Sequence, residues 1–259
     1  MTPGEVAERR GEVPPEPRKL GWVLGPPDEV GLIGQIGETY DPFRTLPTLF
    51  RLFAEVEDTP DAFAAFAEEY GYLRTGRVQG FLTPHPIPEQ YSAWEHARVN
   101  LAFAVRLWDA LKTGCPDRVI GSQGFPLVAK SDGESLEVAA TDSRIDLSGL
   151  VADSPREAVQ VALRFVVRRG LLRAGVTPTL KVTDAPYGAG LKMTFAVSTL
   201  LGAMWLQLAL AIDGNCDFRI CPVCEKWWDA TEARSHKQVC SQKCRSKRTY
   251  DRNKQGGGG

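Results

Sequence analysis

Four of the six cysteines in this 259-residue chain gather near its C-terminal end, at a spacing that suits a metal ion. Cys221 and Cys224 form a C-x2-C pair, and Cys240 and Cys244 form a C-x3-C pair after fifteen intervening residues. Structural zinc takes four soft ligands in a tetrahedron, and two such pairs supply them. A C-x2-C turn directs both sulfurs inward, and an i,i+4 spacing puts the second pair on one helix face. We therefore expect one structural Zn²⁺ at these four cysteines.

Other uses of these cysteines compete with zinc. The segment 221–224 is similar to the C-P-x-C centre of thiol oxidoreductases, in which the first thiol has a lowered pKa. That motif opens a helix after a strand, whereas here Glu-Lys-Trp-Trp follows. A disulfide patch needs an oxidising compartment, and residues 1–20 have no apolar core of the kind a signal peptide needs. We therefore expect a cytoplasmic protein and favour zinc over a redox centre, a disulfide or another metal. Cys216 and His236 are expected to be bystanders.

The elements that must position the cysteines are a hairpin and a helix. Residues 225–231 are expected to form the first strand of the hairpin, with residues 233–239 returning beside it. A helix over 241–254 then carries the last ligands, which makes a treble-clef-like module. Trp227 and Trp228 face opposite sides of the expected strand. Packing of both rings in the small core of the module is favoured. The alternative is that one ring packs beside the cysteines while the other stacks on a ligand or docks against the rest of the protein.

The charge of the chain is unevenly distributed. Residues 217–259 contain ten Lys or Arg and five Asp or Glu, a net charge of +5, so the rest of the chain carries −6 against a total of −1. A basic tail on an acidic body suggests a polyanionic partner. On the expected helix, basic side chains form two stripes that can contact phosphates. The candidate nucleic-acid-binding residues are Lys243, Arg245, Lys247, Arg248 and Arg252.

A basic terminal helix can also serve purposes that involve no nucleic acid. Its charged side chains can keep the helix soluble, pair with acids of the body, or offset the formal charge of about −2 on zinc with four thiolates. Ion pairs with the body would favour a protein-interaction or structural module, whereas exposed side chains would favour nucleic-acid binding.

The C-terminal segment resembles a known family. The order C-x2-C, aromatic residues, a basic stretch, and then V-C-S-x2-C followed by Arg and Lys is similar to the finger of the CGNR-type bacterial zinc-finger proteins. Those proteins carry a helical N-terminal domain and are regarded as transcription regulators. The resemblance implies that Cys221, Cys224, Cys240 and Cys244 are the ligands and that the helix after Cys244 faces DNA. The C-G-N-R signature itself is replaced here by Cys-Arg-Ser-Lys at 244–247.

The residues before the cysteines predict a predominantly helical α+β body. We expect a disordered segment at 1–20, the body at 21–214, the zinc module at 215–255 and a glycine tail at 256–259. The predicted elements have recognisable start or stop signals. They are a short helix over 44–56, a helix with Thr59 as N-cap and Gly71 near its end, a helix over 88–114 ending at Gly114, a hairpin around Asp132-Gly133, a helix from Ser154 to Gly170, a strand over 177–184, a turn over 187–190 and a core helix over 193–212.

Two further questions concern the body. The uncharged run 193–212 is long enough to span a membrane, but its Thr, Ser, Gly and Gln residues favour a buried helix. His85 and His96 belong to no H-E-x-x-H motif, and phosphate-binding glycine loops and G-x-S-x-G are absent from the sequence. We therefore expect no enzyme.

The favoured function is a DNA- or RNA-binding, transcription-regulator-like protein, and the alternative is a protein-interaction or structural zinc module on a body that senses a ligand or self-associates.

Overall fold

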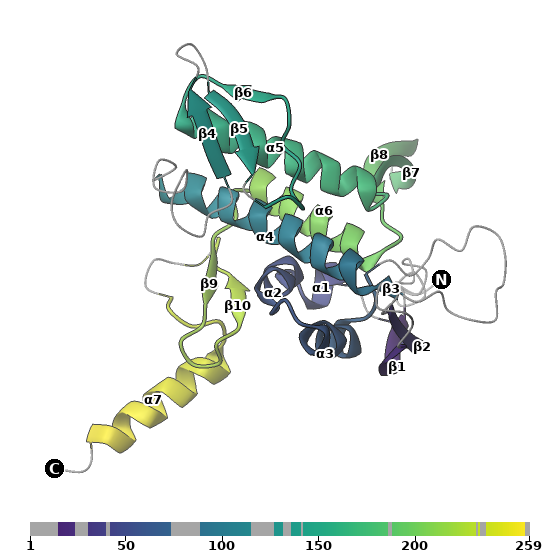
Figure 1. Cartoon of the computed structure of the whole chain (residues 1–259). Helices are drawn as coiled ribbons and strands as arrows, with labels where there is room; N and C mark the ends of the chain where they lie inside the picture. The colour runs from purple at the N-terminus through teal and green to yellow at the C-terminus, as the bar shows by residue number, and fades with distance from the viewer. Residues whose placement is uncertain are drawn as a thin grey trace.

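The computed structural model describes residues 15–23, 31–39, 42–73, 89–114, 127–131, 136–140, 142–185, 188–231, 233 and 237–256. These residues form an α+β protein with a predominantly helical body, as the sequence predicts (Figure 1). The helices are α1 (Pro42–Thr45), α2 (Leu49–Glu55), α3 (Pro60–Tyr70), α4 (Tyr91–Thr113), α5 (Pro155–Arg173), α6 (Leu200–Asp213) and α7 (Gln242–Gly256).

The strands form small antiparallel sheets at the margins of the body. The strands are β1 (Pro15–Val23), β2 (Gly31–Thr39), β3 (Glu89–Gln90), β4 (Leu127–Ser131), β5 (Leu136–Ala140), β6 (Leu150–Ala152), β7 (Thr177–Ala185), β8 (Gly188–Ala196), β9 (Phe218–Ile220) and β10 (Trp227–Asp229). Their orders are β1-β2-β3, β4-β5-β6, β7-β8 and β9-β10. The predicted hairpin β4–β5 and the predicted strand over 177–184 are confirmed.

Local capping signals correctly located several helix ends. The Thr59 hydroxyl accepts a hydrogen bond from the Ala62 N–H at 3.2 Å, and Pro60 takes the first helical position of α3. The Ser154 hydroxyl accepts a hydrogen bond from the Glu157 N–H at 3.2 Å at the start of α5. Gly114 ends α4 with φ 68°, a left-handed conformation that favours glycine.

Two predicted boundaries near the chain start are wrong. Residues 15–20, expected to be disordered, belong to strand β1, while residues 1–14 lie outside the described residues. The predicted helix over 44–56 is divided into α1 and α2, because the turn at Pro47-Thr48 separates them. Proline lacks the N–H that a continuous helix needs.

Two predicted bounds near the core helix are also wrong. Helix α5 passes through Gly170 and ends at Arg173. A Cβ on Gly170 would lie 2.3 Å from the Trp205 ring, so this glycine serves the close packing of α5 against α6 rather than ending the helix. Residues 193–196 belong to β8, and α6 begins only at Leu200, where the Thr199 hydroxyl accepts a hydrogen bond from the Gly202 N–H at 2.9 Å. In the described part of the chain, no helix is long and apolar enough to cross a membrane.

The body packs around α4, which contacts α5, α6 and α2 (Figure 1). Aromatic rings from α2, α3 and α4 form a cluster of Phe53, Phe66 and Trp94, with ring centroids 5.0 to 6.3 Å apart. The Trp94 indole N–H donates to Glu89 Oε2 at 2.9 Å, so the buried ring keeps a polar partner.

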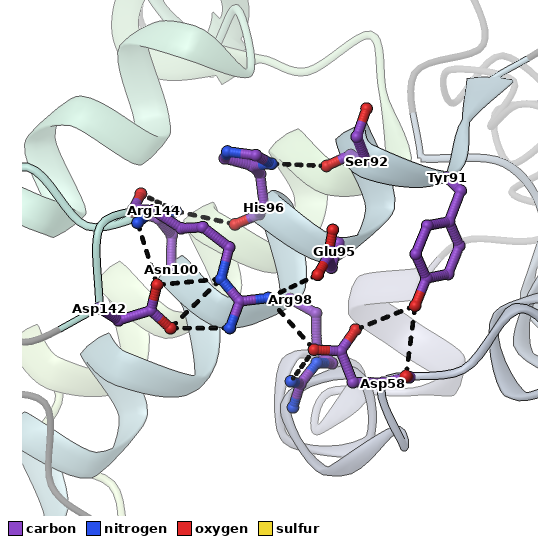
Figure 2. Close-up of polar contacts among 9 residues, drawn as sticks. All are labelled: Asp58, Tyr91, Ser92, Glu95, His96, Arg98, Asn100, Asp142 and Arg144. Carbon is purple, nitrogen blue, oxygen red and sulfur yellow. Dashed lines mark hydrogen bonds and ion pairs between the residues drawn. The ribbon is translucent and has the colours of Figure 1, made fainter. Parts of the chain in front are cut away.

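A network of charged side chains joins three segments of the body (Figure 2). The Arg144 guanidinium donates to Asp142, to Glu95 on α4 and to Asp58 just before α3, with shortest distances of 2.7, 2.7 and 3.2 Å. Arg98 also donates to Asp58 at 3.0 Å. The hydrogen bond from Arg144 is the main reason that the pKa of Asp142 is lowered. Glu95 is therefore engaged in an ion pair, while Nδ1 of His96 lies 2.7 Å from the Ser92 carbonyl.

We predict that Arg144→Ala lowers the free energy of unfolding by about 2 kcal/mol at neutral pH, because charge-assisted hydrogen bonds to three carboxylates are lost. A carboxyl group whose pKa is lowered by folding stabilises the protein above its unfolded pKa, and this contribution disappears as pH falls through the folded pKa. The difference between wild type and variant should therefore shrink on acidification, as measured by denaturant unfolding. Arg169→Ala, which removes one exposed ion pair with Asp146, is the control and should lower the free energy of unfolding by less. Equal losses in both variants would contradict the network's role.

Candidate metal centre and basic helix

The four predicted cysteines come together in the structure. Their sulfur atoms all lie within 4.8 Å of one another, and Cys240 Sγ is 3.6 Å from both Cys224 Sγ and Cys244 Sγ. Four sulfurs bound at about 2.3 Å to a tetrahedral metal are separated by about 3.8 Å. The cluster thus has the size and the donor set that a tetrahedral thiolate site requires, and the four cysteines are positioned to hold a metal ion.

The first cysteine pair occupies the turn of a β-hairpin. Strand β9 ends at Ile220 and β10 begins at Trp227, and these two residues are cross-strand partners. Inside the turn, the Cys221 N–H donates to the Lys226 carbonyl at 3.0 Å, and the Glu225 N–H donates to the Cys221 carbonyl at 2.8 Å. Glu225 has φ 57°, an uncommon conformation for a residue other than glycine. This tight turn directs both sulfurs to one side.

The second pair lies at the start of α7, where Cys244 is in the first helical turn and Cys240 precedes the helix, so the expected placement of both on one helix face is wrong. The Ser241 hydroxyl accepts a hydrogen bond from the Cys244 N–H at 3.3 Å, which caps the helix immediately after Cys240. Cys244 is the one buried residue among 241–254, and it packs with Trp228, Val239 and Cys221 in the small core of the module. The first turn of α7, together with the hydrogen bond from Arg248 to Gln238, therefore attaches this helix to the rest of the module.

The predicted hairpin of the module is wrong in its pairing. Strand β10 pairs with β9, which precedes the cysteine turn, and not with a returning strand over 233–239. Of that range the structure describes Ala233 and residues 237–239, and none of these is in a strand. A three-residue strand such as β9 is too short to show an alternating pattern, which is why the sequence did not reveal it.

The protonation of the thiols differs across the cluster. Burial disfavours the Cys221 thiolate, yet backbone N–H groups of Cys240, Val223 and Cys224 stabilise it, and together they lower its pKa to about 6. Burial, together with the neighbouring thiols, raises the pKa of Cys240 to about 12. A metal ion that binds all four sulfurs must therefore displace protons, so its affinity rises with pH.

The alternatives to a metal site fit the geometry poorly. The distances of 3.6 Å from Cys240 Sγ to its two neighbouring sulfurs are far from the roughly 2.05 Å of a disulfide bond. A redox centre needs an accessible first thiol at the start of a helix, but Cys221 is 0% exposed and begins a turn between two strands. Cys216 lies outside the cluster, as expected of a bystander, and His236 is outside the described residues.

Helix α7 projects from the module away from the body (Figure 1). Four of the five candidate nucleic-acid-binding residues are exposed, namely Lys243, Arg245, Lys247 and Arg252. Arg248 is half-buried and donates to Gln238 Oε1 at 2.7 Å. Within the described residues none of the five forms an ion pair with an acid.

The hairpin, unlike α7, docks against the body. The Trp227 indole N–H lies 3.0 Å from both carboxylate oxygens of Glu55 on α2, and Phe218 packs on Phe50 with ring centroids 5.6 Å apart. Trp228, on the other face of β10, is buried beside the cysteines. The favoured prediction that both tryptophans pack in the module is thus wrong for Trp227, which takes the alternative role of docking.

Arg51 lies at the centre of this junction and is only 5% exposed. Its guanidinium donates to both carboxylate oxygens of Asp109 on α4 at 2.7 and 3.0 Å. It also lies 4.6 Å from the ring centroid of Trp227, 5.1 Å from that of Trp108 and 5.4 Å from that of Phe218. Cation–π contacts of this kind strengthen when the cation is removed from water. No sequence motif indicated Arg51, because its partners come from separate elements that are distant in the chain.

Comparisons with known proteins identify no relative. No family model matches the chain, and neither the curated proteins nor the solved structures include a significantly similar one. The resemblance to the CGNR-type finger therefore stays a prediction, and the function is inferred from the residues of this chain.

We predict that the purified protein binds one zinc ion per chain and that Cys240→Ser weakens zinc affinity by roughly 100-fold, since one of four thiolates is lost. Chelator competition and metal analysis measure both quantities. The matched control is Cys216→Ser, which removes a thiol outside the cluster and should leave zinc affinity unchanged. Equal zinc loss in the two variants, or full affinity in Cys240→Ser, would refute the assignment.

The two tryptophans should respond differently to removal. Trp227→Ala deletes the contacts with Glu55 and Arg51, so we expect it to lower the free energy of unfolding by about 2 kcal/mol while zinc stoichiometry is retained. Trp228→Ala removes a ring from the core that surrounds the cysteines and should weaken zinc binding itself. Zinc titration and thermal unfolding of the two variants separate these effects. Loss of zinc in Trp227→Ala alone would contradict this division of roles.

Proposed function

We propose that this chain is a zinc-stabilised nucleic-acid-binding protein of the transcription-regulator type, in which α7 is the binding element. The observation that carries the proposal is the excess of exposed basic side chains on α7. Six Lys or Arg and one Asp lie between residues 242 and 256, and most of the basic side chains are exposed with no acid partner in the described structure.

Zinc is the metal that best suits the four-cysteine site. Zn²⁺ prefers tetrahedral thiolate coordination, and a site with four protein ligands is closed to substrate water, so the role is structural. Among its described residues the module has five buried ones in its own core, and two of them are cysteines. A core this small needs the metal to fold, as in other small zinc modules.

A polyanion is the partner that these side chains favour. An isolated helix is only marginally stable in water, and after its first turn α7 has no buried residue through Lys254. Contact with phosphates would satisfy the basic side chains and hold the helix, and the release of counterions would provide affinity that depends on salt.

The alternative function is a protein-interaction or structural zinc module, and one observation favours it for part of the module. The hairpin face with Trp227 and Phe218 is used for docking on the protein's own body. This docking leaves α7 uncovered, however, so it accounts for the hairpin and not for the charged helix.

The test is binding of the zinc-loaded protein to random duplex DNA and to single-stranded RNA across a salt series. We expect affinity to fall steeply as salt rises. Substitution of Arg245, Lys247 and Arg252 by Ala should reduce the slope of log affinity against log salt by roughly 3, about one unit per phosphate contact.

The charge-preserving variant with Arg245→Lys, Lys247→Arg and Arg252→Lys is the matched control and should retain the slope. If neither polymer binds at low salt, the proposal fails and the module is a structural or protein-docking element. If the Ala variant binds as the wild type does, α7 is not the binding element.

A further inference from the structure

The side chains of α7 form three parallel rows. A helix advances about 100° per residue, so residues spaced i, i+4, i+7 and i+11 share one face. The outward row is Gln242, Ser246, Thr249 and Asn253; the lysine row is Lys243, Lys247, Tyr250 and Lys254; and the arginine row is Arg245, Arg248 and Arg252. The uncharged outward row therefore lies between two basic rows.

The outward row lies opposite the cysteines. By the same helical geometry, the outward row points about 180° around the helix axis from Cys244, the residue that faces the core of the module. All four of its members are exposed, and α7 projects clear of the body (Figure 1). The one acid of the helix, Asp251, follows Cys244 by seven residues and so lies on the cysteine side. No acid therefore interrupts the outward row or either basic row.

This arrangement matches the major groove of duplex DNA. The groove is about 12 Å wide, and a helix with its side chains is about 10–12 Å across, so one helix fits with a phosphate backbone on each flank. Basic rows on both flanks suit two backbones, whereas a single strand offers one. The major groove of duplex RNA is too narrow for side chains to reach the bases.

We infer that α7 enters the major groove with the outward row toward the base edges, so that Gln242 and Asn253 read sequence while the basic rows hold the phosphates. This inference rests on the proposed function and deepens it. Amide side chains pair in a bidentate manner with adenine N6 and N7. The Thr249 hydroxyl donates to the Arg245 carbonyl at 3.1 Å, which leaves its methyl group to contact thymine.

The experiment selects preferred sites for the full zinc-loaded chain from a randomised duplex DNA library. Affinities for a selected and a scrambled duplex are then compared. Gln242→Ala and Asn253→Ala, tested separately, should each lower the preference for the selected site about 10-fold, with affinity for scrambled DNA and the salt slope unchanged. Lys243→Ala should instead weaken binding to the selected and the scrambled duplex equally. Gln160→Ala, which removes an exposed amide on α5, is the matched control and should change neither quantity.

The outcomes separate this inference from the proposed function. Binding to DNA without sequence selection, an unchanged preference in both amide variants, or binding to single-stranded RNA alone would overturn the inference while nucleic-acid binding stands. Absence of binding to either polymer at low salt would reject both. Zinc content and helical circular dichroism of each variant verify that the module is folded, which is expected because both amides are exposed.

Discussion

The convergence of four cysteine sulfurs is the constraint on which the C-terminal part of this protein depends. The hairpin turn supplies two of them and the first turn of α7 supplies the last, while Cys240 lies between. Around them the module buries only Trp228, Ala230 and Val239 among its described residues. Since so small a core contributes little hydrophobic stabilisation, the position of α7 depends on the contacts of Cys244 and on the Ser241 cap. Beyond this turn, Arg248 contacts Gln238, and the other side chains through Lys254 are exposed.

The module and the body are joined by a buried cation. Arg51 is neutralised by Asp109, and its planar guanidinium lies against the rings of Trp108, Phe218 and Trp227. Removing Asp109 would leave an unpaired charge in an apolar environment, which is costly. The hairpin therefore has two functional faces. One face, with Trp227, docks on α2, and the other, with Trp228, supports the cysteines. The charged helix then extends from an anchored base.

Several arginines of the body form ion pairs with acids of the same chain, whereas the basic residues of α7 form none in the described structure. In the described body, Arg51, Arg98, Arg144 and Arg169 all have carboxylate partners, and most of these ion pairs join separate segments. On α7 the basic residues have no such partners among the described residues, although they follow regular rows. Basic side chains that form no ion pair within the protein can contact an anionic ligand. The concentration of six Lys or Arg and one Asp on the projecting α7 is the physical basis for the proposal that this helix binds a polyanion (Figure 1).

The sequence alone determined the features that depend on neighbours in the chain. The caps at Thr59, Ser154 and Gly114 and the two cysteine pairs are predictable, because hydrogen bonds over three or four residues and the geometry of one turn decide them. Only the tertiary structure decided the pairing of β10 with β9, the strand conformation at 193–196, the role of Gly170 under Trp205, and the junction at Arg51. Each of these depends on contacts between residues that local patterns do not connect, where packing and register outweigh local propensity.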